Sequence, residues 1–204
     1  AAVAYRGVLA GVFVGMEVLV PLTLTVQWHY KPILAGLPLM FTAVAWAVAS
    51  QIHGRSPRVP KAIFLRLGLF LMAVGGLGMA LVATRTAPGW LAFAVWPAAG
   101  AGAGFGITSV SVALMEYTTD ADRGTDAASL QLSDSSGSAV TAAFAGAMVS
   151  LAVQGRISYG GGFAIAFLTM AVLAVTAATR AGRLRPPGSP NGLRPVDATP
   201  GPVS

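Results

Sequence analysis

The chain alternates long apolar stretches with short polar connections. Six stretches of about twenty mostly apolar residues follow one another, and each is long enough to cross about 30 Å of hydrocarbon as an α-helix. Buried helices of a large soluble protein are usually shorter and keep a polar face. The pattern therefore predicts an all-α, polytopic membrane protein with six transmembrane helices at Tyr5–Gln27, Pro32–Ile52, Ala62–Ala83, Trp90–Met115, Ala127–Val153 and Gly161–Thr179.

Composition narrows the chemistry further. Charged residues make up 10% of the chain, against about 25% in soluble domains. There is no cysteine, which excludes disulfides, thiolate metal sites and cysteine nucleophiles. The two histidines, His29 and His53, stand at span ends, so paired intramembrane histidines for haem, zinc or serine proteolysis are missing. We therefore expect neither an enzyme nor a bound metal or cofactor.

Basic residues lie mostly on one side of the six predicted spans, and the other side carries only Lys31, Arg85 and Arg156. Short basic connections stay in the cytoplasm, so we expect a bacterial cell (inner) membrane protein with both ends of this chain inside. The net charge of +6 then reflects topology, and we expect no nucleic-acid partner. The basic side holds Arg6, Arg55, Arg58, Lys61, Arg66, Arg123, Arg180, Arg183, Arg185 and Arg194.

Two segments differ from the predicted bundle, which occupies residues 1–182. Residues 183–204 are rich in proline and glycine, and we expect a disordered cytoplasmic tail there. Residues Glu116–Asp126 form the one acidic connection, with Asp126 placed to cap the fifth span. The chain enters its first span almost at once, without an initiator Met or a charged leader, which is typical of a fragment.

Glu17 lies near the middle of the first predicted span, where a charged carboxylate costs about 2.5–3.5 kcal/mol on insertion scales. We interpret its helix face as lining a protein interior or a water-filled cavity. The alternative is that Glu17 is protonated and bonds to a neighbouring helix, serving only to hold spans together. At about 100° per residue, the residues that share this face are Arg6, Ala10, Phe13, Pro21, Leu24 and Trp28, with Thr25 at its border. Pro21 can open the helix.

Asp134 is the second intramembrane acid, about two turns into the fifth predicted span, on one face with Gln131, Ser138 and Thr141. Either it is a polar group of a cavity, or it is a partly hydrated residue of helix packing. Small residues recur at every fourth position of this span, and such stripes let a neighbouring backbone approach closely. The stripe consists of Ser129, Ser133, Gly137, Thr141 and Ala145.

The fourth predicted span contains the glycine-rich run of residues 100–106. The run does not fit the nucleotide-binding pattern GxGxxG, and no strand precedes it. The pairs Gly100 with Gly104 and Gly102 with Gly106 instead predict close contact with neighbouring helices.

Several features occur together: a basic connection after the second span, an acid in the first, a glycine-rich fourth and an Arg-Gly turn before the fifth. Three stretches are the most specific: GVFVGMEVLVPLTLTVQW from Gly11, LAGLPLMFTAVAWAVASQIHGR from Leu34, and DRGTDAASLQLSDSSGSAV from Asp122. Over residues 5–182 the chain resembles the C-terminal half of a bacterial, drug-efflux-like transporter of the major facilitator superfamily. The family's GxxxD(R/K)xGR loop departs here, because residues 50–61 read SQIHGRSPRVPK without the acid, which puts a gating salt bridge through this loop in doubt.

The resemblance implies one half-bundle of two inverted three-helix repeats, completed by an N-terminal six-helix half of the same transporter. In the family, the first, second, fourth and fifth helices of this half line the central cavity. That arrangement puts Glu17 and Asp134 on lining helices and leaves the third and sixth helices at the periphery.

The leading hypothesis is a secondary active transporter that exports small amphipathic or cationic organic compounds in exchange for protons. Its partners are the lipid bilayer, the other half, the substrate and protons. The alternative is a non-transporting membrane scaffold or assembly subunit, in which both acids only hold helices together. In the first hypothesis the coupling or cavity residues are Glu17, Asp134, Thr25, Gln131 and Ser138, with Phe13 and Trp28 offering apolar and cation–π contact.

Overall fold

The structure is a computed structural model that describes residues 2–115 and 123–181. These residues form α-helices and one short 3-10 helix, without a strand among them. Six helical segments are long and apolar enough to cross a membrane, which confirms the predicted all-α class and the number of spans. The elements are α1 (Ala2–Glu17), α2 (Leu19–Trp28), α3 (Pro32–Arg55), α4 (Lys61–Ala83), η1 (Gly89–Leu91), α5 (Ala92–Met115), α6 (Arg123–Val153) and α7 (Tyr159–Ala181).

The helix ends differ from the predicted ones by a few residues. The first span is not one helix but two, α1 and α2, which are separated at Val18. Helix α6 begins at Arg123, so Asp126 lies in its first turn, although the side chain of Asp126 lies outside the described part. Residues 116–122 of the predicted acidic connection and the predicted tail 183–204 are also outside it.

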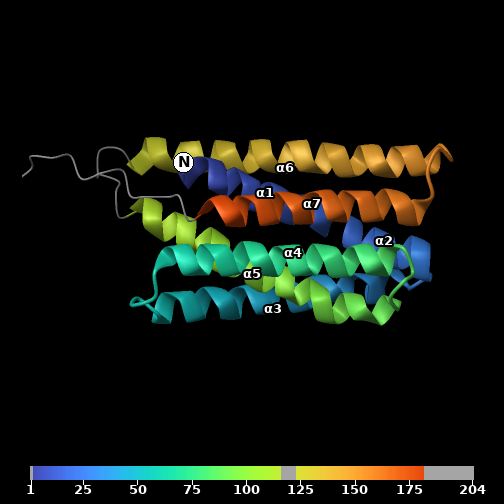
Figure 1. The fold of residues 1–204 in the computed structure, drawn as a ribbon, viewed down its shortest axis with the longest axis horizontal. Coiled ribbons are helices and arrows are strands. Elements are labelled where there is room, and N and C mark those ends of the chain that lie inside the picture. The colour runs from blue at the N-terminus through green and yellow to red at the C-terminus, as the bar shows by residue number, and fades with distance from the viewer. Residues whose placement is uncertain (1, 116–122, 182–204) are drawn as a thin grey trace, which may run out of the picture.

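The helices lie side by side in one antiparallel bundle (Figure 1). Helices α6 and α3 form its two edges, and in this view α4 and α7 lie in front of α1 and α5. Helix α1 begins and α7 ends at the same end of the bundle. We call this the basic end, because its described basic residues are Arg6, Arg55, Arg58, Lys61, Arg66 and Arg180.

Helix packing relates the first three spans to the last three. Helix α1 packs on α6, and in the corresponding positions α5 packs on α3. The two remaining helices, α4 and α7, pack on each other. One pair breaks the correspondence, since α4 packs extensively on α5 whereas α7 makes a smaller contact with α1.

Glycines bring helix α5 close to its neighbours. A Cβ atom built on Gly104 would lie 2.6 Å from the main-chain oxygen of Trp46 in α3, and one built on Gly102 would lie 2.5 Å from the main-chain oxygen of Gly68 in α4. Both distances are shorter than side chains tolerate. The predicted close contact of the glycine-rich span is therefore confirmed, with Gly104 facing α3 and Gly102 facing α4.

The edge helices carry the most exposed apolar side chains. Ile33 of α3 is 83% exposed, and Val140 and Leu132 of α6 are 70% and 69% exposed. Such surfaces are suited to lipid or to a further bundle of helices rather than to water. Together with the six apolar helices, they are compatible with a multi-pass membrane protein.

Candidate functional site

Glu17 stands at the break of the first span, midway along it. Helix α1 ends at Glu17, and α2 begins two residues later. The cause is Pro21, because proline has no N–H to donate to the carbonyl four residues back, and its ring crowds that carbonyl. The carbonyl in question belongs to Glu17 itself. The Glu17 side chain is half-buried, and its carboxyl makes no hydrogen bond or ion pair with another described residue.

A broken transmembrane helix offers polar groups at a depth where an unbroken helix offers none. In membrane proteins such breaks occur where the backbone is buried in protein or lines a cavity, and many transporters bind ions or substrates at them. Glu17 supplies both a main-chain carbonyl without its helical donor and an ionisable carboxyl. This position can therefore exchange a proton or bind a cation.

Thr25 does not add a free hydroxyl to this position. Its Oγ1 donates to the main-chain oxygens of Pro21 at 2.9 Å and Leu22 at 3.1 Å. The hydroxyl thus stays on its own helix, where it compensates the carbonyl groups next to the proline.

Asp134 forms an ion pair with Arg6, across the contact between α6 and α1. Arg6 Nε donates to both carboxylate oxygens of Asp134, at 2.8 and 2.9 Å, and Arg6 Nη2 lies 2.8 Å from Oδ2. Arg6 Nη1 donates to Ser111 Oγ of α5 at 2.6 Å. The two charged side chains are only 18% and 19% exposed. The guanidinium of Arg6 thus connects three helices. It also neutralises Asp134, the one acid of α6 whose side chain lies within the described part of the chain.

Beside this ion pair, the polar side chains of α6 become more exposed towards the surface of the bundle. Ser138 is half-buried, while Gln131 is exposed and donates to exposed Ser135 at 3.5 Å. At about 100° per residue, these side chains lie beside Asp134 on the helix surface. Asp134 bonds to Arg6 of α1, and Arg6 bonds to Ser111 of α5. The polar face of α6 therefore lies next to the side of the bundle where α1 and α5 meet. Lipid cannot hydrogen-bond such groups.

Phe13 belongs to an aromatic cluster in the core. Its ring packs edge-on against Trp46 of α3 at 5.2 Å and stacks on Trp96 of α5 at 5.7 Å, between ring centroids. Phe13 is 6% exposed and Trp96 is fully buried. Trp96 Nε1 has no hydrogen-bond partner among the described residues. Any substrate contact of Phe13 would therefore require the cluster to open.

Trp28 holds the end of the first span in place. Its Nε1 donates to the main-chain oxygen of Val82 in α4 at 3.0 Å. The Arg85 guanidinium lies 6.0 Å from the centroid of the Trp28 ring, a cation–π distance, and also donates to the main-chain oxygen of Gln27. Trp28 is eleven residues beyond Glu17, so roughly 16 Å of helix separates them. The two residues do not form one site.

The contact that holds Asp134 against Arg6 is built from small residues on both helices. Three glycines of α1 spaced by four face the small stripe of α6, and Thr141 Oγ1 donates to the main-chain oxygen of Gly11 at 2.6 Å. A Cβ atom built on Gly11 would lie 2.7 Å from the main-chain oxygen of Gly137. The three contacting pairs are Gly7 with Ser133, Gly11 with Gly137 and Gly15 with Thr141.

Only half of this contact was predicted from the sequence. The small stripe of α6 was recognised but its partner in α1 was not, although the spacing of Gly7, Gly11 and Gly15 is a readable signal of the same kind. Arg6 was placed on the basic side and on the Glu17 face, and Asp134 had no predicted partner.

Searches against protein-family models, curated proteins and solved structures gave no match. Within residues 2–115 and 123–181, no three histidine, aspartate or glutamate side chains gather to hold a metal ion.

Proposed function

We propose that this chain is one half of a secondary active transporter, which exports small amphipathic or cationic organic compounds in exchange for protons. The observation that carries the proposal is the half-buried, unpaired carboxyl of Glu17 at the proline break of a transmembrane helix. An uncompensated carboxyl in this place is expensive, and it makes no hydrogen bond or ion pair that would hold helices together in the described part of the chain. A group that must accept and release a proton or a cation justifies that cost.

The polar face of α6 supports a second half. Gln131 and Ser135 are exposed beside the ion pair, in a helix otherwise apolar enough to cross a membrane. Covered by an N-terminal six-helix bundle, they would line a hydrated space instead of facing acyl chains. The resemblance to the major facilitator superfamily implies the same pairing with an N-terminal six-helix half. The basic residues at one end of the bundle favour a cytoplasmic location of that end, in a bacterial cell membrane.

In this proposal the two acids act differently. Glu17 alternates between a protonated state and a state in which the carboxylate binds a cationic substrate. Asp134 holds Arg6 and thereby fixes α1 against α6, and a hydrated cavity that reached this pair would weaken it by raising the local dielectric constant. Gln131 and Ser138 offer neutral polar contacts beside it.

The test uses the intact transporter that contains this chain, in inside-out vesicles energised with a proton gradient, and the lipophilic cation ethidium as the probe. Glu17→Gln should abolish uncoupler-sensitive ethidium transport, whereas Glu17→Asp should retain part of it. Gln154→Ala serves as the matched control, because Gln154 is exposed at the far end of α6 and bonds only to Ser150 of its own helix. Proton-driven transport that is equal in Glu17→Gln and in the control would refute the role of Glu17.

One observation favours the alternative, a membrane scaffold or assembly subunit that transports nothing. Asp134 is neutralised by Arg6, and the helices around the pair meet at backbone distance, as in a permanently closed assembly. A scaffold predicts that both acids affect only stability. Glu17→Gln would then raise the resistance of the folded protein to unfolding, because it removes an ionisable group from the membrane, and neither the wild type nor the variant would transport ethidium.

A further inference from the structure

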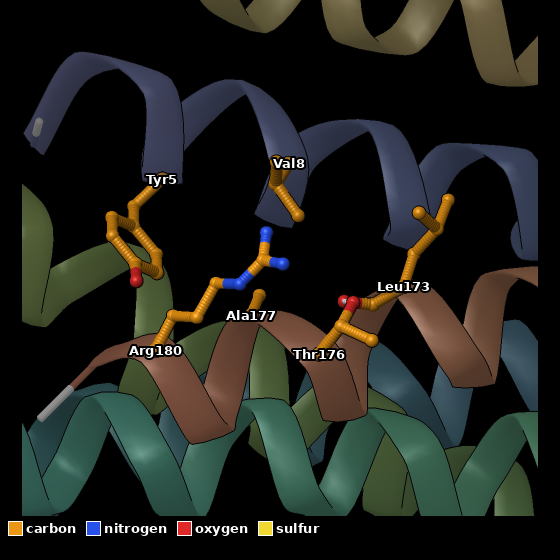
Figure 2. Close-up of a pocket in the computed structure, with 6 residues that line it drawn as sticks. All are labelled: Tyr5, Val8, Leu173, Thr176, Ala177 and Arg180. Carbon is orange, nitrogen blue, oxygen red and sulfur yellow. Dashed lines mark hydrogen bonds between the residues drawn. The ribbon is translucent and has the colours of Figure 1, made fainter.

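A crevice opens between α1 and α7 near the basic end of the bundle. Its volume is about 280 Å³, and Figure 2 shows the Arg180 side chain extending from the last turn of α7 towards α1, between Tyr5 and Val8. Apolar side chains form most of the walls. The lining residues are Tyr5, Val8, Leu173, Thr176, Ala177 and Arg180.

The crevice exists because a helix pair that joins the first three spans to the last three packs differently from its counterpart. Helix α4 packs closely on α5 through glycines; a Cβ atom built on Gly75 would lie 2.7 Å from Ala99 Cβ, and one built on Gly78 would lie 2.8 Å from Val95. The counterpart contact of α7 with α1 is smaller, and no glycine lines it. The larger side chains Val8 and Leu173 stand in its place, 37% and 42% exposed. The result is an apolar opening between α1 and α7.

Arg180 is exposed and lies in the last turn of α7, where the helix dipole favours a cation. Arg180 makes no ion pair and no hydrogen bond with any residue that the structure describes. A second groove of about 370 Å³ lies on the other side of α7, against α4, with Arg66, Phe70 and Val175 among its lining residues. Arg66 is likewise without such a partner in the described ranges, and it stands in the second turn of α4, where the helix dipole does not favour a cation.

We propose that the crevice binds an anionic glycerophospholipid. Arg180 binds the phosphate, one acyl chain lies along Val8, Leu173 and Ala177, and the Tyr5 ring closes the end near the membrane surface. A guanidinium donates to phosphate oxygens in a bidentate manner. Basic pockets between transmembrane helices are suited to anionic headgroups. The Arg66 groove repeats the same combination of a cation and apolar walls at the same end of the bundle. The proposal does not depend on transport.

The experiment is native mass spectrometry of the purified protein in detergent, with phosphatidylglycerol or phosphatidylcholine of identical acyl chains added. The first bound phosphatidylglycerol should be favoured about fivefold over phosphatidylcholine, as expected for one basic residue near a net anionic headgroup, because the choline ammonium of phosphatidylcholine offsets the charge of its phosphate. Arg180→Gln should abolish this preference. The matched control, Arg156→Gln, removes an exposed arginine at the opposite end of the bundle and should keep it.

A second variant tests the crevice rather than the charge. Ala177→Phe fills the space between α1 and α7, so it should weaken binding of both lipids about equally while leaving the helical circular dichroism unchanged. Equal binding of the two lipids by the wild type, or an undiminished preference in Arg180→Gln, would overturn the proposal. Displacement of the bound lipid by millimolar inorganic phosphate would also overturn it, because an exposed charge alone would then account for the binding.

Discussion

Two helix pairs, α1 with α6 and α5 with α3, occupy corresponding places in the bundle and approach at backbone distance, but they bury different groups. Between α1 and α6 lie an ion pair and the hydroxyl of Thr141. Among the described residues, α3 and α5 are joined by aromatic packing through Phe13 of α1, on which both Trp46 and Trp96 pack, and by one weak hydroxyl contact between Thr108 and Ser50 at 3.3 Å.

The difference shows that one packing geometry can support two kinds of contact. Aromatic stacking is insensitive to protons and gains from exclusion of water. An ion pair of two partly exposed groups depends on the local dielectric constant. Of the two edge helices, α6 is therefore the one whose attachment to the bundle responds to hydration, whereas we expect α3 to remain attached.

The largest expected effect comes from filling the close contact between α1 and α6. Gly137→Leu places a side chain against the Gly7 carbonyl, and overpacking at a backbone contact costs about 3 kcal/mol or more. We expect little folded protein, measured as the loss of helical signal in a titration with sodium dodecyl sulfate.

Its matched control is Gly146→Leu, on the same helix, where a built Cβ atom meets nothing within 4 Å. This variant should unfold like the wild type or slightly later, because leucine has the higher helix propensity. Equal stability of the two leucine variants would contradict the close approach of α1 and α6.

The next largest effect comes from removing the ion pair, which the α1–α6 contact has and the α3–α5 contact lacks among the described residues. Removing one member of a buried ion pair costs about 3–5 kcal/mol, and since Arg6 and Asp134 keep nearly a fifth of their surface we expect about 2 kcal/mol for Arg6→Gln or Asp134→Asn. The double variant should lose less than the sum of the two, with a coupling free energy above about 1 kcal/mol.

Ser111→Ala is the comparison for that cycle, because it leaves the ion pair in place and removes the outer hydrogen bond of Arg6 together with the bond from Ser111 Oγ to the Ile107 main-chain oxygen of its own helix; it should cost under about 1 kcal/mol. Additive losses in the double variant, measured by the same unfolding titration, would mean that the two charges do not stabilise each other.

Much of this architecture could be predicted from sequence, for a physical reason. A span of twenty apolar residues has few alternatives to a transmembrane helix, and glycine runs such as Gly100–Gly106 permit close approach wherever they face a neighbour. Pro21 indicated that the first helix can open. The break lies at Glu17, because the main-chain carbonyl of Glu17 is the one to which residue 21 would donate if it had an N–H.

The partners of the polar residues could not be predicted in the same way. Helical periodicity gives the direction of a side chain but not the helix it meets, so Phe13 was assigned to a cavity face although it lies within an aromatic cluster. Arg6 is separated from Asp134 by 128 residues, and positive charge near a span end is explained equally well by topology. Only the packing of α1 on α6 turns that charge into an ion pair.

The smallest expected effect lies in the other contact. Thr108 Oγ1 donates to Ser50 Oγ between α5 and α3 at 3.3 Å, and hydrogen bonds between transmembrane helices contribute about 0.6 kcal/mol on average. Ser50→Ala should therefore lower the free energy of unfolding by about 0.5 kcal/mol, several-fold less than Asp134→Asn. Thr169→Ala is the control, since the Thr169 hydroxyl bonds only to Ile165 of its own helix and its loss should be close to neutral. If Ser50→Ala instead proved as costly as Asp134→Asn, the α3–α5 contact would depend on polar groups as strongly as the α1–α6 contact does. Helix α3 would then be expected to respond to hydration as well, and the distinction between the two edges of the bundle would be lost.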